Sequence, residues 1–118
     1  MWEIEHYVSP TGKRPISDFF SKLNKTTELP YVLRDIDLLA SLGNEARRPL
    51  AAPLDNGIYE LRTRIINKQF RILYFFFYNE KIILSHGILK KGPDVPLKNI
   101  YLALEHKKEY FERHERKK

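Results

Sequence analysis

Hydrophobic and polar residues alternate in the first stretch of the chain, residues 2–8. Trp2 and Ile4 fall on one face of an extended chain, whereas Glu3 and Glu5 fall on the other. Alternation of this kind is typical of a strand with one buried face. It predicts a half-buried strand at the edge of a sheet.

Three apolar stretches follow one another in the second half of the chain. They cover Ile58–Ile65, Gln69–Tyr78 and Lys81–Lys90, and the connections "INKQ" and "YNEK" are short enough for hairpins. These stretches predict an antiparallel meander. The middle one is apolar on both faces, as expected of a central strand that is covered on both sides.

Helical spacing of apolar residues predicts three helices. Pro15 suits the first position of a helix through "ISDFFSKL", and a closing helix starts near Pro96, with a charged face that runs to Lys118. A longer helix between them ends at Gly43. Pro30 either belongs to its first turn or marks a short break. Its apolar positions are Leu29, Leu33, Ile36, Leu39 and Leu42.

The order of these elements predicts the fold class. Residues 44–57, "NEARRPLAAPLDNG", carry two prolines and a turn signal, so we expect a loop there. The order is then β–α–α–β–β–β–α, which gives an α+β fold with a small antiparallel sheet of about four strands packed with helices. The 118 residues fit a single domain, 1–118.

Composition and charge narrow the classes of protein to consider. The sequence has no cysteine, so we expect a reducing, cytoplasmic setting. We see no signal peptide, and the longest apolar run, Ile72–Tyr78, is too short to span a membrane. Of the net charge of +6, residues 57–104 carry +5, from eight basic and three acidic side chains. This excess indicates an anionic partner such as nucleic acid, or else a basic face that is merely solvated.

The sequence lacks the common motifs of metal-dependent and cofactor-dependent enzymes. It has no glycine-rich phosphate loop, and its four histidines have no metal-ligand spacing. Asp94 is the only carboxylate between Lys81 and Glu105, so a two-metal nuclease site is disfavoured. We therefore expect no metal and no cofactor.

Cationic side chains on the predicted strands form the candidate catalytic site. A suitable hairpin register would bring Arg62 next to Arg71, with Lys90 and Lys91 at the end of the neighbouring strand. Guanidinium groups bind phosphate oxygens through paired donors and could stabilise a phosphoryl transition state without a metal. With RNA the nucleophile would be the substrate's own 2′-hydroxyl. Its proton acceptor would be His86 or a lysine with a lowered pKa.

Each of these residues also has a purely structural interpretation. Arg62 could form a surface salt bridge, and His86 could be a hydrogen-bonded strand histidine. Arg71 is harder to explain in this way, because a charge in a hydrophobic strand needs a partner.

Three segments together resemble the toxins of the RelE/HigB superfamily, in their phage-derived branch. They are "SLG…PLDNGIYELRTR", "FRILYFFFYNEKIILSHGILKK" and "VPLKNIYLALEHKKEYFER", and they occur in the family's order over nearly the whole chain. The resemblance implies a RelE-like fold and a metal-independent mRNA endoribonuclease that acts at the ribosome. It also implies a cognate antitoxin with a helix-turn-helix DNA-binding domain.

The resemblance assigns roles to individual residues. It implies that Arg62 and Arg71 contact the scissile phosphate, and that His86 and the basic pair Lys90 and Lys91 complete the site. Further RNA contacts are expected from Arg64 and Lys98.

The sequence departs from the family's pattern after the basic pair. Asp94 and Val95 stand where the branch usually has lysine and threonine, and Asn99 stands where it usually has glutamate. A non-catalytic nucleic-acid- or protein-binding module that kept the fold is therefore an alternative, and a phage structural component is another. The antitoxin would bind either the edge strand, residues 2–8, or the apolar side of a helix.

Overall fold

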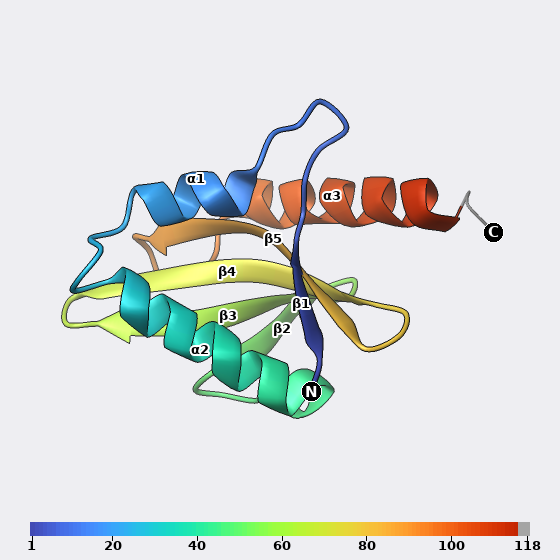
Figure 1. Ribbon diagram of the computed structural model, residues 1–118. Helices are drawn as coiled ribbons and strands as arrows, with labels where there is room; N and C mark the ends of the chain where they lie inside the picture. Colours follow the sequence, from blue (N-terminus) through green and yellow to red (C-terminus); the bar gives the residue numbers. More distant parts are fainter. Residues whose placement is uncertain (116–118) are drawn as a thin grey trace.

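The computed structural model describes residues 1–115 of the chain, and its elements confirm the α+β class (Figure 1). All three predicted helices and all four predicted strands are present, and one short strand lies where a loop was expected. In chain order the elements are β1 (Glu3–His6), α1 (Pro15–Ser21), α2 (Leu29–Leu42), the 3₁₀ turn η1 (Gly43–Glu45), β2 (Ala51–Asp55), β3 (Ile58–Ile65), β4 (Lys68–Phe77), β5 (Lys81–Lys90) and α3 (Leu97–Glu115).

The sheet has five strands in the order β1-β5-β4-β3-β2. Strands β3, β4 and β5 form the predicted antiparallel meander, and β1 is the predicted edge strand. Because β1 pairs with β5 in parallel, the sheet is mixed and not purely antiparallel. Alternation along β1 predicts which face is buried and carries no information on strand direction.

The additional strand is β2, which pairs antiparallel with β3. Its five residues include Pro53, which weakens the strand signal in the sequence but is tolerated on an edge strand. Asn56 and Gly57 make the connecting turn with φ of 47° and 81°, a backbone region that asparagine and glycine adopt more readily than other residues.

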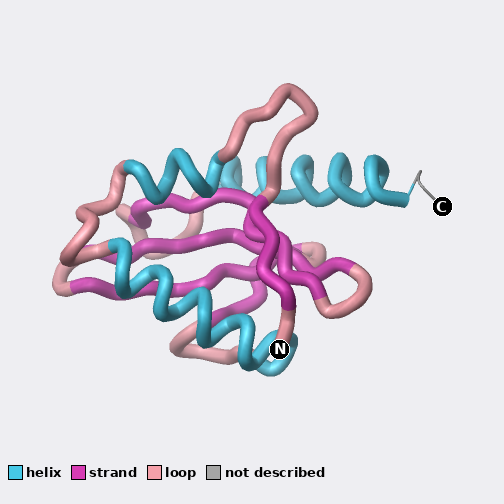
Figure 2. The backbone as a smooth tube through the Cα atoms, in the orientation of Figure 1, coloured by secondary structure: helices cyan, strands magenta, loops and turns pink. Residues whose placement is uncertain are grey.

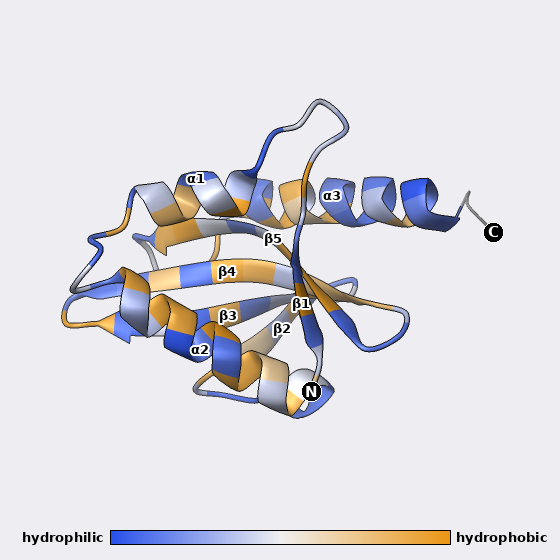
Figure 3. Cartoon of the chain, in the orientation of Figure 1, coloured by the Kyte–Doolittle hydropathy of each residue, from blue (hydrophilic) through white to orange (hydrophobic). Residues whose placement is uncertain are grey.

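Helices cover both faces of the sheet, α1 and α2 on one and α3 on the other (Figures 1 and 3). Strand β4 supplies side chains to both cores, as predicted from its apolar pattern: Phe70, Ile72 and Tyr74 face α1 and α2, whereas Leu73 and Phe75 face α3. The strand is therefore buried on both sides, and a charged residue in it must find a partner within the protein.

Helix α2 is fixed at both of its ends. Pro30 lies in its first turn, where a missing N–H costs nothing. At its C-terminus Gly43 has φ of 56°, and the Trp2 indole packs so closely on it that a Cβ atom would collide with the ring. Between the ends, the Thr63 hydroxyl donates a hydrogen bond of 2.6 Å to the buried Asp35 carboxylate, which ties α2 to β3.

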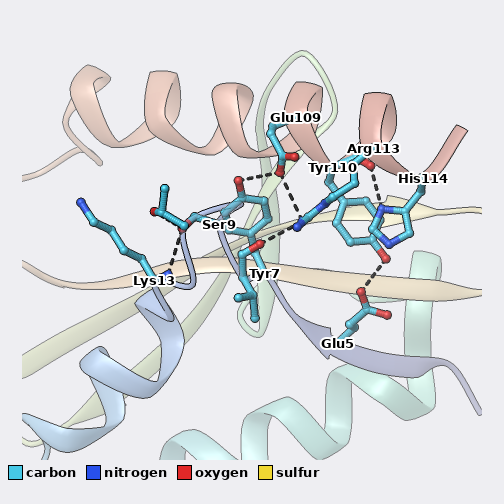
Figure 4. A network of polar contacts seen from close by, with 10 residues as sticks. Glu5, Tyr7, Ser9, Lys13, Glu109, Tyr110, Arg113 and His114 are labelled. Atoms are coloured by element: carbon cyan, nitrogen blue, oxygen red, sulfur yellow. Dashed lines mark hydrogen bonds and ion pairs between the residues drawn. The ribbon is translucent and has the colours of Figure 1, made fainter. Parts of the chain in front are cut away.

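Helix α3 is joined to the N-terminal segment by polar contacts (Figure 4). The Tyr7 hydroxyl donates to Glu109 at 2.8 Å, and Arg113 donates to the Val8 carbonyl at 2.9 Å. The predicted charged face of this helix extends to Lys118, which lies outside the described residues. Within residues 1–115, every helix is too short or too polar to cross a bilayer.

Candidate functional site

The two sheet arginines lie directly opposite each other. The β3–β4 register pairs Arg62 with Arg71, which confirms the geometric prediction from strand parity and hairpin length. In the next row of the same face, Arg64 pairs with Gln69, and Gln69 pairs with Lys90 on β5. Three adjacent strands thus bring cationic side chains to the α3 side at one end of the sheet.

Arg71 is almost fully buried and is held by three hydrogen bonds. Its side chain is 2% exposed, and its Nε donates to Glu60 Oε1 at 3.0 Å. Its Nη1 donates to the Phe70 carbonyl at 3.0 Å and its Nη2 to Gln69 Oε1 at 2.7 Å. Since a guanidinium has five N–H donors, one on each terminal nitrogen is left for a ligand. Arg71 is therefore both anchored and able to bind an anion.

Glu60 is the internal partner that the burial of Arg71 requires. Burial lowers the pKa of Arg71, the Glu60 carboxylate opposes this effect, and the neighbouring cations Arg62 and Arg48 lower the pKa further. An arginine stays charged despite such shifts. The site therefore holds a fixed guanidinium whose charge is only partly balanced, which favours an incoming anion.

A cavity of about 470 Å³ opens over this pair. It brings together three of the predicted residues, Arg62, Arg71 and Lys90, and it adds Arg48 from the loop before β2. Four cations face two carboxylates, Glu60 and Asp94, so the lining has a net positive charge. The apolar wall comes from Val95, in the segment after β5, and from Leu97 and Ile100 in the first turns of α3.

Three other predicted contacts lie outside this lining. Arg64, Lys91 and Lys98 are all exposed, and none of them lines the cavity. Arg64 is still close, because it lies one row beyond Arg62 on the same face of β3. Lys91 follows the end of β5, and Lys98 belongs to the first turn of α3.

His86 is also absent from the lining of the cavity. The side chain is buried beneath α3, where Nδ1 hydrogen-bonds with Ser85 Oγ at 2.9 Å and Nε2 with Asn99 Oδ1 at 3.2 Å. Burial lowers the pKa of His86, and the hydrogen bond with Asn99 partly opposes that effect. Because both ring nitrogens are engaged, this geometry matches the structural interpretation of His86.

The departures from the family pattern have defined places in the structure. Asn99 is the hydrogen-bond partner of His86, and Val95 packs in the core beneath α3. Asp94 is exposed and lines the cavity, and no cation within residues 1–115 forms an ion pair with it. Its carboxylate is therefore available to a ligand in the cavity.

Two residues that line the cavity, Glu60 and Arg48, were not among the predicted site residues, although each has a signal in the sequence. Glu60 shares a face with Arg62, and a carboxylate two residues along a strand can reach diagonally to the neighbouring strand. Arg48 carries only the weaker signal of an arginine pair in a proline-containing loop. Within residues 1–115, no group of three or more His, Cys, Asp or Glu side chains is placed to hold a metal ion.

The chain was compared with known proteins and protein families. The family described as "Phage derived protein Gp49-like (DUF891)" matches residues 18–108, more than three quarters of the chain. The matched region contains both arginines, His86 and the two lysines of the candidate site. Among curated proteins no significant match is found.

Proposed function

The chain belongs to the Gp49-like family of phage-derived proteins, within the RelE/ParE-like toxin superfamily, and on this premise we propose that it is a type II toxin that cleaves mRNA without a metal. The observation that carries the proposal is the pairing of Arg62 with Arg71 in a cavity that Lys90 also lines. It would act in the cytoplasm on ribosome-bound mRNA, as RelE- and HigB-type toxins do. Its partner would be an antitoxin with a helix-turn-helix domain.

In the proposed reaction the RNA supplies the nucleophile. The 2′-hydroxyl oxygen attacks the adjacent phosphorus while its proton passes to an acceptor, and the bond from phosphorus to the 5′-oxygen breaks. The products are a 2′,3′-cyclic phosphate and a 5′-hydroxyl. The free N–H groups of Arg71, with Arg62 and Arg48, stabilise the charge that develops on the phosphoryl oxygens. Lys90, which also lines the cavity, would give a proton to the leaving oxygen.

The proton acceptor in this mechanism is Asp94. An acceptor must reach the cavity and have a free lone pair, and His86 meets neither condition in this geometry. Glu60 reaches the cavity, but one of its oxygens is bound to Arg71 in a buried ion pair. Asp94 is exposed, lines the cavity and forms no ion pair within residues 1–115.

Controlled expression in bacteria tests the proposal. The wild-type chain should arrest growth and leave mRNA fragments that end in cyclic phosphate. The double variant Arg62→Ala and Lys90→Ala should allow normal growth, because it removes two cations from the cavity and leaves the buried pair of Arg71 intact.

Arg34→Ala is the matched control, because Arg34 is an exposed arginine on α2 and should leave toxicity unchanged. Circular dichroism would show that each variant is folded. Equal growth and intact mRNA with the wild-type chain would contradict the proposal. A small neighbouring reading frame with a helix-turn-helix pattern would support the antitoxin as partner.

RNA binding without cleavage is the second candidate function. It is favoured by the burial of His86 away from the cavity, which removes the usual imidazole from the reacting groups. Salt-dependent binding of RNA, with no cleavage products even when ribosomes are added, would distinguish this function from that of a toxin.

A further inference from the structure

A second cavity lies on the opposite face of the sheet, between α1 and the end of β5. Its volume is about 500 Å³, within the usual range of ligand pockets, roughly 300–1,000 Å³. We propose that it holds a nucleobase of the bound RNA, with guanine preferred, which rests on RNA being the substrate of the candidate site. Its lining consists of Pro15, Asp18, Phe19, Lys22, Leu23, Glu28, Lys68, Phe70, His86, Gly87, Ile88 and Leu89.

The two cavities lie back to back across the last residues of β5. Lys90 lines the candidate site, and the preceding residue, Leu89, lines the second cavity, because successive side chains of a strand point to opposite faces. The edge strand β1 pairs only with residues 81–84 of β5. Beyond Leu84 no strand within residues 1–115 pairs with β5, and helix α1 lies alongside it, so an RNA chain would pass between the two cavities around the end of β5, at Leu89 and Lys90.

Exposed cations mark this end of the molecule. The connection between α1 and α2, the β3–β4 turn and the end of β5 lie at the same end (Figures 1 and 2). Lys22 and Lys25 follow the end of α1, Arg64 precedes the β3–β4 turn, and Lys91 follows β5, all four of them exposed. A phosphate backbone that leaves the candidate site therefore meets favourable charge on its way to the second cavity.

The interior of the second cavity suits a flat aromatic ring. Phe19 and Phe70 meet edge to face with their centroids 6.1 Å apart, and Leu89 extends the apolar surface. Gly87 lets the Phe19 ring pack directly on the backbone of β5, where a Cβ atom would collide with the ring, and so fixes the position of this aromatic wall. RNA-binding proteins commonly hold single bases against aromatic and apolar surfaces of this kind.

The polar groups at the rim select the base. Asp18 belongs to α1, and Lys22 is the C-cap residue four positions later with helical φ and ψ, so the two residues lie on the same side of the helix. Both are exposed, and neither forms an ion pair within residues 1–115. A carboxylate accepts from the N1–H and N2–H groups of guanine, and an ammonium donates to its O6. Adenine and cytosine present an amino group where guanine has O6, so they would leave the lysine unpaired.

Binding of short RNAs that cannot be cleaved tests this inference. The probes are the fully 2′-O-methylated pentanucleotides CCGCC and CCACC, in which the nucleophile is blocked. The wild-type chain should bind CCGCC at least about tenfold more tightly, as expected for one good two-point base contact. Asp18→Asn and Leu89→Trp should reduce the difference to about twofold or less, because the first removes the acceptor and the second fills the cavity.

Leu38→Trp is the matched control, since Leu38 is a similarly exposed leucine on α2, 46% against 40% for Leu89. The control should keep the preference for guanine. A 6-thioguanosine at the central position should cross-link to residues 15–23 or 86–89 in the wild-type chain. The inference is overturned if the preference is absent, if it survives in Leu89→Trp, or if the cavity takes up only a peptide of a protein partner.

These results separate the inference from the proposed function. A guanine preference that depends on Leu89, in a chain that never cleaves RNA, would support the base site and refute the endoribonuclease. Cleavage by the wild-type chain with the same sites cut in Leu89→Trp would refute the base site alone.

Discussion

At the scale of single residues, the pair of Arg71 and Glu60 links the stability of the protein to its proposed function. The two side chains are 2% and 8% exposed, so each depends on the other for its solvation. The same contact orients the guanidinium so that its remaining N–H groups are free for a phosphate in the cavity. We therefore expect a substitution at either position to change folding as well as the proposed binding of phosphate.

The stability of the Arg71→Ala variant follows from this burial. The change leaves the Glu60 carboxylate buried without its cation, so we expect a loss of about 3–5 kcal/mol in the free energy of unfolding. Urea denaturation followed by circular dichroism measures it. Removal of the exposed Arg14, which forms no ion pair within residues 1–115, by Arg14→Ala should change stability by less than about 1 kcal/mol. A cost for Arg71→Ala as small as that of the control would show that the buried pair is not coupled.

Substitution of Asp94 distinguishes a catalytic carboxylate from an inhibitory one. If Asp94 accepts the 2′-hydroxyl proton, Asp94→Asn should lower the cleavage rate about a hundredfold, the lower end of what general-base catalysis contributes. RNA affinity should stay the same or rise, because a negative charge has been removed from a cationic cavity. Single-turnover cleavage measures the first effect and filter binding the second. Faster cleavage by the variant would mean that Asp94 weakens the site, and Asp55→Asn on β2 serves as the control.

At the level of residues, strand alternation was enough to predict which strand residues pair, but it does not predict the direction of every side chain. Strand alternation and a short connection were enough to pair Arg62 with Arg71. The orientation of His86 is affected by an irregularity in the β4–β5 register, where Ser85 is skipped, and apolar alternation does not reveal such a bulge. Arg48 reaches the cavity from a loop, whose path no sequence period describes.

At the scale of elements, α3 is attached to the sheet by a chain of polar groups. His106 Nδ1 lies 2.8 Å from Ser85 Oγ, which in turn hydrogen-bonds with His86, and His86 with Asn99. Both ends of this chain, Asn99 and His106, belong to α3, and the middle belongs to β5. The helix that supplies the apolar wall of the candidate site is thus fixed through two imidazoles.

These imidazoles make stability depend on pH. Burial, together with the smaller effect of the neighbouring His86, lowers the pKa of His106 from 6.5 to about 4. Between pH 6.5 and about 4 the unfolded chain therefore binds more protons than the folded chain. The contribution of His106 to the free energy of unfolding is fully present above pH 6.5 and is lost as the pH falls. We expect a slope of up to about 1.4 kcal/mol per pH unit for each imidazole.

The variant His106→Phe isolates this contribution. Phenylalanine keeps an aromatic ring against Tyr7, on which His106 stacks at 4.1 Å, but it has no proton to bind. Urea unfolding between pH 7 and 5 should therefore give a flatter dependence than in the wild-type chain. Parallel curves for the two proteins would show that His106 does not carry the pH dependence.

The elements themselves were predicted in type and order, apart from β2. Long stretches with a clear period were recognisable, whereas the five residues of β2 contain a proline and gain their strand geometry from pairing with β3. The parallel pairing of β1 was not predictable either, because it depends on how the chain returns to the sheet after two helices.

At the scale of the whole molecule, charge is distributed unevenly. Residues 57–104 carry +5 of the net +6, and the register places their arginines and Lys90 at one end of the α3 face. A chain that binds RNA there should lose affinity as the salt concentration rises, because the release of counterions from the RNA then becomes less favourable. The salt dependence of RNA binding changes only when a substituted residue contacts the RNA. It therefore distinguishes the candidate site from the basic residues on the exposed side of α3.

The salt dependence of RNA binding tests that location. If about three phosphates are neutralised, the slope of log K against log salt concentration should be about −2 for single-stranded RNA. Lys90→Ala should make the slope less negative by about 0.7, because one phosphate contact is lost. Lys108→Ala, on the exposed side of α3, should leave it unchanged. Because both variants remove one positive charge, a change with Lys108→Ala and none with Lys90→Ala would place the RNA on α3 instead of the sheet.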